Sequence, residues 1–153
     1  MPSPDDALTA VYRDLLLDHF RRPRNSGALE HPDVAVHQRN PLCGDEIELQ
    51  LAFDGDVLRD VRFRGQGCTI SQASASMMTQ RLQGKSVAEI EEVARRFTAM
   101  LHGDREAAVD PALGDLRSLA GVARLPVRLR CALLAWSALA QGLSERPVDQ
   151  KPE

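Results

Sequence analysis

Hydrophobic residues recur at helical spacing near the start of the chain, where they form one stripe: Leu8, Val11, Tyr12, Leu15, Leu16, His19 and Phe20. Steps of three or four residues place such side chains on one face of a helix. Ser3 and Pro4 suit the N-cap and the first helical position, and Pro23 ends the pattern. We therefore expect a helix between Pro4 and Pro23, in which His19 is a hydrogen-bonded core or boundary residue rather than a metal ligand.

Apolar and polar residues alternate strictly over residues 46–53, and a similar alternation resumes over residues 57–64. A period of two predicts two strands, each buried on one face and joined by a turn at residues 54–56. Val34 and Val36 indicate a shorter strand before them. These segments predict a small sheet of three strands.

The register of the predicted hairpin depends on the length of its loop. A two-residue loop would place Leu49 opposite the charged Asp60. A three-residue loop would place Leu49 opposite Val61, with Leu51 facing Arg59 as one mismatch. We therefore predict the three-residue loop.

The rest of the chain has mostly helical patterns. We predict helices over residues 71–84, 86–102 and 126–142, a loop with a short helix over 103–124, and a frayed tail from about 144. Strands that precede most of the helices indicate an α+β fold. The expectation is a single domain over 1–153, with a three-stranded antiparallel sheet covered on one face by helices.

Composition and charge narrow the functional classes. The net charge of -3 argues against a nucleic-acid-binding protein, because phosphate binding relies on a clustered excess of Lys and Arg. Asp5 and Asp6 stand where a secretory signal would carry positive charge. The longest nearly apolar stretch, residues 131–140, is too short to cross a bilayer. We expect a cytoplasmic protein that binds neither nucleic acid nor membrane.

The three cysteines are the candidate chemistry. Their odd number and the reducing compartment argue against a disulfide framework. Cys43 is expected in the loop before the hairpin, and Cys68 at the start of the helix after it. Cys131 is expected on an exposed turn of the last helix, away from its apolar face. Buried inert cysteines usually belong to apolar stripes, so these positions favour reactive thiols or metal ligands.

Zinc sites take four tetrahedral ligands of sulfur, imidazole or carboxylate type. Asp45 lies two residues after Cys43, so both can point the same way in an extended segment, and Asp45 can be the fourth ligand. Thiolates and a carboxylate would leave excess negative charge, which Arg130, next to Cys131, could offset. No CxxC pair is present, so spacing alone also allows an ordinary turn acid at Asp45 and an ordinary surface arginine at Arg130.

The residues around these ligands resemble a known family. NPLCGD at 40–45, GQGCTISQASASMMT at 65–79 and LPVRLRCALLAW at 125–136 are similar to the U-type iron-sulfur assembly proteins. Within that family the chain looks closer to the SufU branch, because Arg130 stands where IscU scaffolds have histidine and because 103–124 is similar to the SufU insertion.

The resemblance implies an IscU/SufE-like fold and a zinc-dependent sulfurtransferase role. Persulfide sulfur would come from a SufS-like, pyridoxal-phosphate-dependent cysteine desulfurase and pass to a downstream Suf-type cluster scaffold. The implied metal ligands are Cys43, Asp45, Cys68 and Cys131. Cys43 is the expected sulfur acceptor, because Gly44 gives its loop backbone freedom. Residues 125–128 depart from the chaperone motif of IscU, which speaks against an Hsp70-type chaperone partner.

Three alternatives remain. The protein could be a scaffold that assembles a [2Fe-2S] cluster or holds iron at the same ligands, since thiolates accept both zinc and clusters. The zinc could be purely structural. Cys68 could also be the nucleophile of a hydrolase, with His31, His37 or His102 as its base.

Overall fold

The computed structural model describes residues 4–41 and 44–147, with residues 4–9 described by their backbone alone. The elements in chain order are α1 (Pro4–Arg21), β1 (Val34–Arg39), β2 (Glu46–Asp54), β3 (Val57–Gln66), α2 (Thr69–Leu82), α3 (Val87–Leu101), α4 (Arg105–Ala108), the 3-10 helix η1 (Pro111–Arg124) and α5 (Pro126–Glu145). The N-cap expected at Ser3 and the tail from residue 148 lie outside the described residues. Within the described ranges, no helix is long and apolar enough to span a membrane.

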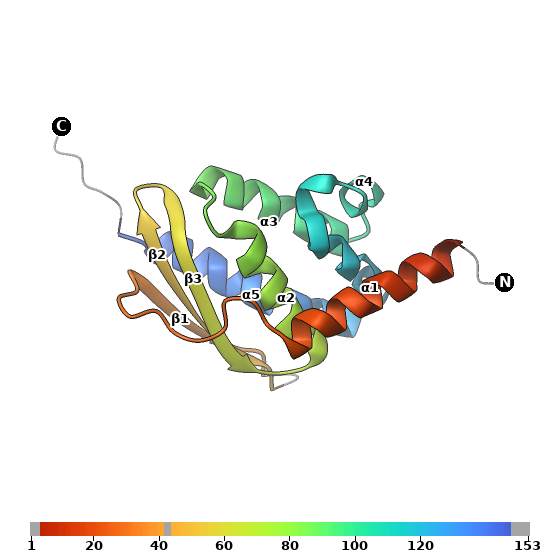
Figure 1. The fold of residues 1–153 in the computed structure, drawn as a ribbon, viewed down its shortest axis with the longest axis horizontal. Helices are drawn as coiled ribbons and strands as arrows, with labels where there is room; N and C mark the ends of the chain where they lie inside the picture. Colours follow the sequence, from red (N-terminus) through yellow and green to blue (C-terminus); the bar gives the residue numbers. More distant parts are fainter. Residues whose placement is uncertain (1–3, 42–43, 148–153) are drawn as a thin grey trace.

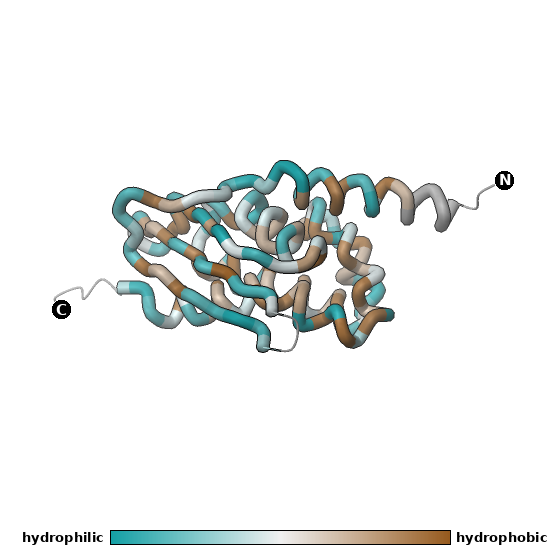
Figure 2. The backbone as a smooth tube through the Cα atoms, turned by 90° about the horizontal axis from the view of Figure 1, so that it is seen from below, coloured by the Kyte–Doolittle hydropathy of each residue, from teal (hydrophilic) through white to brown (hydrophobic). Residues whose placement is uncertain are grey.

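The strands form one antiparallel sheet in the order β1-β2-β3. α5 packs along β1 and β2, while α2 packs against β3 and α5, so the helices form a layer on the sheet (Figure 1). Figure 2 shows hydrophobic and hydrophilic residues alternating along the strands. The predicted α+β fold, with a three-stranded sheet covered by helices, is confirmed.

The hairpin register differs from the prediction. Leu49 pairs with Phe63 and Leu51 pairs with Val61, so apolar residues face each other without a mismatch. The predicted pairing of Leu49 with Val61 is therefore wrong by two positions on the partner strand. Because the error is an even number of residues, the buried face was still assigned correctly.

A bulge explains the difference. The turn has two central residues, Gly55 and Asp56, and Gly55 has a φ of +61°, which glycine adopts without strain. A register shift between Ala52 and Phe53 leaves Arg59 as one extra residue in β3. Counting residues had excluded a two-residue turn because it paired Leu49 with Asp60. The bulge shifts the register, so apolar residues pair with each other despite the short turn.

The segment 103–124 is more helical than expected. α4 and η1 follow each other, and η1 contains a kink at Gly114, whose φ is +54°. Leu113, Leu116 and Leu119 are fully buried. Leu116 and Leu119 are one 3-10 turn apart and so lie on one side of η1, whereas Leu113 precedes the kink at Gly114. α5 also differs slightly from its prediction: the helix expected over residues 126–142 continues through Glu145.

His19 anchors α1 to the rest of the molecule. Its ring is fully buried, with Nδ1 2.7 Å from Ser76 Oγ of α2 and Nε2 3.1 Å from Asp115 Oδ2 of η1. The interpretation of His19 as a hydrogen-bonded core residue is confirmed. Val11 and Phe20 of the predicted apolar stripe are exposed. The start of α1 extends beyond the body of the molecule (Figure 1).

Candidate metal centre

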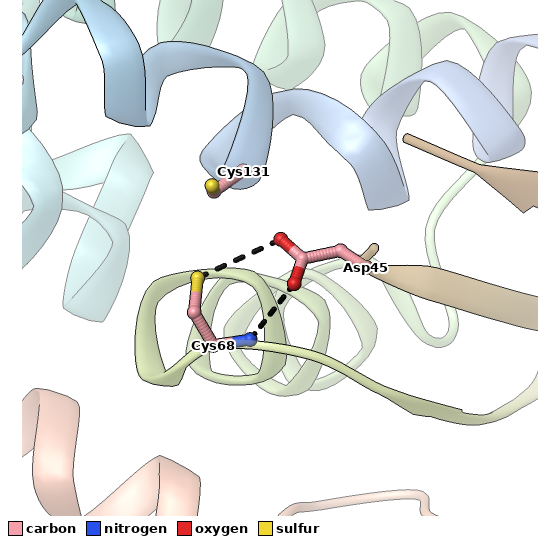
Figure 3. A group of neighbouring side chains, drawn as sticks. All are labelled: Asp45, Cys68 and Cys131. Carbon is pink, nitrogen blue, oxygen red and sulfur yellow. Dashed lines mark hydrogen bonds between the residues drawn. The ribbon is translucent and has the colours of Figure 1, made fainter. Parts of the chain in front are cut away.

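Three of the four predicted ligands lie together at one end of the sheet (Figure 3). Asp45 directly precedes β2, Cys68 directly precedes α2, and Cys131 lies in the second turn of α5. One carboxylate oxygen of Asp45 and the two sulfur atoms lie within 4.8 Å of one another. Cys43, the fourth predicted ligand and the expected sulfur acceptor, lies outside the described residues.

Asp45 is held in the site by its side chain and its backbone. It is 2% exposed, and its Oδ1 accepts the backbone N–H of Cys68 at 2.9 Å. Its Oδ2 lies 3.6 Å from Cys68 Sγ. The Asp45 carbonyl accepts the N–H of Asn40, and the Asn40 carbonyl accepts the N–H of Gly44. These bonds fix the carboxylate between the end of β1 and the start of α2.

Cys68 is the N-cap of α2. Its Sγ accepts the backbone N–H of Ser71 at 3.4 Å, and Ser71 Oγ donates to the Cys68 carbonyl at 3.0 Å. The sulfur therefore lies at the positive end of α2, which favours negative charge on a ligand atom. The prediction that Cys68 begins this helix is confirmed.

Gly67 is a part of the site that sequence reasoning missed. A Cβ placed there would lie 2.5 Å from Asp45 Oδ1 and 2.5 Å from Ser71 Oγ. The close approach of Asp45 to the start of α2 therefore depends on the absence of a side chain. The available signal was a glycine directly before an expected N-cap.

Cys131 is only 2% exposed, so the expectation of an exposed helix turn is wrong. α5 contacts α2, η1 and two strands, so it is covered on more than one side. Small residues such as Ala132 and Ala135 permit this close packing, and Ser74 Oγ of α2 donates to the Ala132 carbonyl at 2.6 Å. The prediction considered only the stripe of large residues on this helix. It therefore missed that the small residues beside the stripe are also buried.

Arg130 and the histidines of the hydrolase alternative form no hydrogen bond or ion pair with the described ligands. Arg130 is exposed and forms no ion pair with another described residue, so its charge-balancing role stays a prediction. His31, His37 and His102 are exposed. His37 contacts Glu46, and His102 contacts the Thr98 carbonyl, so neither is bonded to Cys68. The hydrolase interpretation gains no support from this geometry.

The donor set fits a divalent metal. Two sulfurs and a carboxylate oxygen are ligands that zinc accepts, and tetrahedral coordination at about 2.3 Å places sulfur donors about 3.8 Å apart. Because the three donor atoms already lie within 4.8 Å, a shift on the order of 1 Å would bring them to that spacing. The side chains therefore could hold a metal ion with little rearrangement.

Comparison with known proteins places the chain in a family. It belongs to the NifU-like N terminal domain family, whose pattern it matches over residues 11–151. The predicted resemblance to the SufU branch of IscU-like proteins is confirmed by the relatives.

A protein of Bacillus subtilis (strain 168) named zinc-dependent sulfurtransferase SufU is 41% identical over 139 residues, which cover 90% of this chain and 92% of the relative. The iron-sulfur cluster assembly scaffold protein IscU of Streptococcus pyogenes serotype M1 is 43% identical over 136 residues, or 89% of this chain and 84% of the relative. The crystal structure of FiSufU from Fervidobacterium islandicum AW-1, described as a proposed scaffold for the SUF system, superposes with a TM-score of 0.79 at 32% identity, covering 88% of this chain and 97% of the other.

Proposed function

We propose that this chain is a zinc-dependent sulfur acceptor in iron-sulfur cluster assembly, which takes persulfide sulfur from a cysteine desulfurase. The observation that carries the proposal is the convergence of Asp45, Cys68 and Cys131. The 41% identity to a zinc-dependent sulfurtransferase supports the choice of metal and reaction. The proposed setting is the cytoplasm, with a SufS-like desulfurase as donor and a Suf-type cluster scaffold downstream.

Cys43, Asp45, Cys68 and Cys131 would hold the zinc. A bound zinc ion keeps its cysteine ligands deprotonated at neutral pH. Asp45 supports the site from within, because its carboxylate also accepts the Cys68 N–H. The described ligands come from three separate elements, so the chain itself orients the donors before metal arrives.

Cys43 is the proposed acceptor of sulfur. Its thiolate would attack the terminal sulfur of the donor's cysteine persulfide, forming a new S–S bond on Cys43 while the donor's S–S bond breaks and the donor cysteine leaves as a thiolate. Two observations support this choice by comparison: Cys131 is buried, and the Cys68 sulfur is engaged by the N–H of Ser71. Burial thus limits access to the Cys131 thiol, and the hydrogen bond from Ser71 limits the freedom of the Cys68 thiol to react.

The scaffold function is the second candidate. It is favoured by the 43% identity to an IscU scaffold, and the same thiol ligands could carry a [2Fe-2S] cluster. A scaffold would hold iron and inorganic sulfide and absorb visible light, whereas a zinc protein is colourless. Metal content therefore separates the two candidates.

The first test is the metal and absorption of freshly purified protein. We expect a colourless protein with about one zinc per chain, because tetrahedral zinc needs all four proposed ligands. Substitution of Asp45 by alanine should lower the zinc content. An iron-sulfur absorption band with negligible zinc would instead support the scaffold.

The second test maps the transferred sulfur. After incubation with desulfurase and cysteine, alkylation and mass spectrometry should find persulfide chiefly on Cys43. The Cys43→Ser variant should lose most of its stimulation of the desulfurase. Persulfide chiefly on Cys131, or full stimulation by the Cys43→Ser variant, would show that the acceptor was chosen wrongly.

A further inference from the structure

A buried hydroxyl links the two helices that carry the described cysteine ligands. Ser74 lies in the second turn of α2 and is fully buried. Its Oγ donates to the Ala132 carbonyl of α5 at 2.6 Å and accepts the indole N–H of Trp136 at 3.1 Å. Both partners lie in α5 and are one helical turn apart. The Ser74 hydroxyl is therefore donor and acceptor at once in the contact between α2 and α5.

This contact lies next to both described thiols. Cys68 is the N-cap of α2, and Cys131 lies across from it in α5 (Figure 3). Ala132 directly follows Cys131. Ser71, whose Oγ donates to the Cys68 carbonyl at 3.0 Å, precedes Ser74 by about one turn, so the two serines share a face of α2. That face therefore holds Cys68 through Ser71 and the turn of α5 with Cys131 through Ser74.

Packing alone would be satisfied by alanine at position 74. Ala73 and Ala75 on either side are also buried, and alanine is the better helix former. A buried hydroxyl loses its hydration, which is costly unless the group is hydrogen-bonded. Serine within a helix often bonds a carbonyl of its own preceding turn, as Ser71 does. Ser74 bonds a neighbouring helix instead, so its hydroxyl adds a fixed link to α5.

The separation of the two sulfur atoms depends on how α2 and α5 pack. Cys68 caps one helix and Cys131 lies in the other, so a shift between the helices changes the distance between the sulfurs. Tetrahedral zinc requires about 3.8 Å between two thiolate ligands. The α5 side of the link is itself held, because Trp136 stacks on Phe97 of α3 with ring centroids 4.5 Å apart. The Ser74 contact thus opposes the shift that would part the sulfurs.

We propose that Ser74 is a positioning residue of the metal centre. Its hydroxyl fixes the turn of α5 with Cys131 relative to the start of α2 with Cys68, and so sets the spacing of two sulfur ligands. This inference rests on the proposed function, because it takes the two thiols as metal ligands. Ser74 acts through these thiols without being a ligand, and its role does not depend on which thiol accepts sulfur.

The test compares Ser74→Ala with the matched control Ser76→Ala. Ser76 lies in the same helix and is equally buried, but its Oγ lies 2.7 Å from His19 Nδ1 of α1. Both variants lose a buried hydroxyl, whereas only Ser74→Ala loses the link to α5. The melting temperature of each variant shows that it folds and how far it is destabilised.

Two readouts report on the metal. Competition with a chromophoric chelator gives the dissociation constant for zinc. Co²⁺ serves as a coloured probe of the same donor atoms, because its visible bands depend on coordination geometry and its sulfur-to-cobalt charge-transfer band depends on the bound thiolates. A residue that only stabilised the fold would change neither set of bands.

Ser74→Ala should raise the zinc dissociation constant about tenfold or more, as removal of groups that orient metal ligands commonly does. Its cobalt complex should show a weaker charge-transfer band, because the two sulfurs no longer reach one ion at the required spacing. Ser76→Ala should keep the unmodified constant and spectrum, although its melting temperature also falls. Trp136→Phe keeps the Ser74 bond to Ala132 and the ring beside Phe97, so its zinc constant should rise less than that of Ser74→Ala.

An unchanged zinc constant and cobalt spectrum in Ser74→Ala would overturn the proposal. An equal loss of affinity in Ser76→Ala would do the same, since the effect would then follow stability alone. Failure of the proposed function looks different: the unmodified chain would bind zinc but fail to stimulate the desulfurase, and the role of Ser74 at the metal site would stand. An unmodified chain that binds no zinc would overturn both.

Discussion

At the scale of single residues, the site depends on one missing side chain. Gly67 lets the carboxylate of Asp45 approach the start of α2, where it accepts the Cys68 N–H at 2.9 Å. No positive φ is involved at this glycine, so the requirement comes from space alone. Gly67 is therefore a positioning residue, which acts on the proposed metal ligands Asp45 and Cys68 without being a ligand itself.

We expect Gly67→Ala to raise the dissociation constant for zinc at least about tenfold, because the new methyl group displaces Asp45 from Cys68 and a tenfold change is only about 1.4 kcal/mol. Competition with a chromophoric chelator measures this constant without a desulfurase. Gly121→Ala is the matched control, since a Cβ at Gly121 meets nothing within 4 Å. Equal zinc affinity in both variants would contradict the positioning role.

The residue scale also shows where sequence reasoning succeeds. Asp45 and Cys68 could be predicted as neighbours in a site because each lies at the boundary of a clearly patterned element. The burial of Cys131 could not, because it depends on how many elements cover α5, and the pattern of large residues on one helix does not contain that information. The requirement at Gly67 was also missed, since it arises partly from a contact with Asp45, which lies before the hairpin in the chain.

At the scale of elements, local sequence signals predicted where helices start more accurately than how the strands pair. A capping box of Ser86 and Glu89 starts α3 where the sequence predicts a helix, and both of its partners lie within one turn. The hairpin register was predicted wrongly because the bulge at Arg59 adds one unpaired residue to β3. The alternation of apolar and polar residues in the sequence does not reveal that extra residue. Pairing between strands thus depends on irregularities that periodicity alone does not reveal.

Asp110 links α3 to η1, and its contribution to stability should depend on pH. Its carboxylate accepts the Ala112 N–H at the start of η1 and pairs with Arg96 of α3 at 3.0 Å. The hydrogen bond from Ala112, followed by the ion pair with Arg96, lowers the pKa of Asp110 below its ordinary value. A lowered folded-state pKa stabilises the fold above the unfolded-state pKa, and this stabilisation is lost as pH falls through the folded-state pKa.

We therefore expect Asp110→Ala to lower the melting temperature by about 2–4 °C at neutral pH, through loss of the cap and the ion pair. The gap between this variant and the unmodified protein should narrow as pH falls below about 4, near the ordinary pKa of an aspartate. Asp110→Asn serves as the control, because an amide can still cap η1 but carries no charge. A gap that stays constant down to strongly acid pH would show that the charge of Asp110 contributes nothing.

At the scale of the whole molecule, the fold brings together ligands from distant parts of the chain. Asp45 directly precedes β2, Cys68 directly precedes α2, and Cys131 lies in α5. The hydrophobic core between these elements already holds the described donor atoms within 4.8 Å. Metal binding at a site that the unfolded chain lacks adds directly to the free energy of unfolding. A metal ion bound there would crosslink the start of β2, the start of α2 and α5, and would not be the cause of the fold.

That distinction gives the last prediction. Removal of zinc with a strong chelator should leave a folded protein, because the core is large, but should lower its melting temperature by on the order of 10 °C, as expected when a ligand is present far above its dissociation constant. Calorimetry with and without chelator measures the shift. In the Cys131→Ser variant the difference between the two scans should largely vanish, since the link to α5 is lost even if the variant is itself less stable. A chelator that removes all zinc yet leaves the melting temperature unchanged would mean that the bound metal does not hold the sheet, α2 and α5 together.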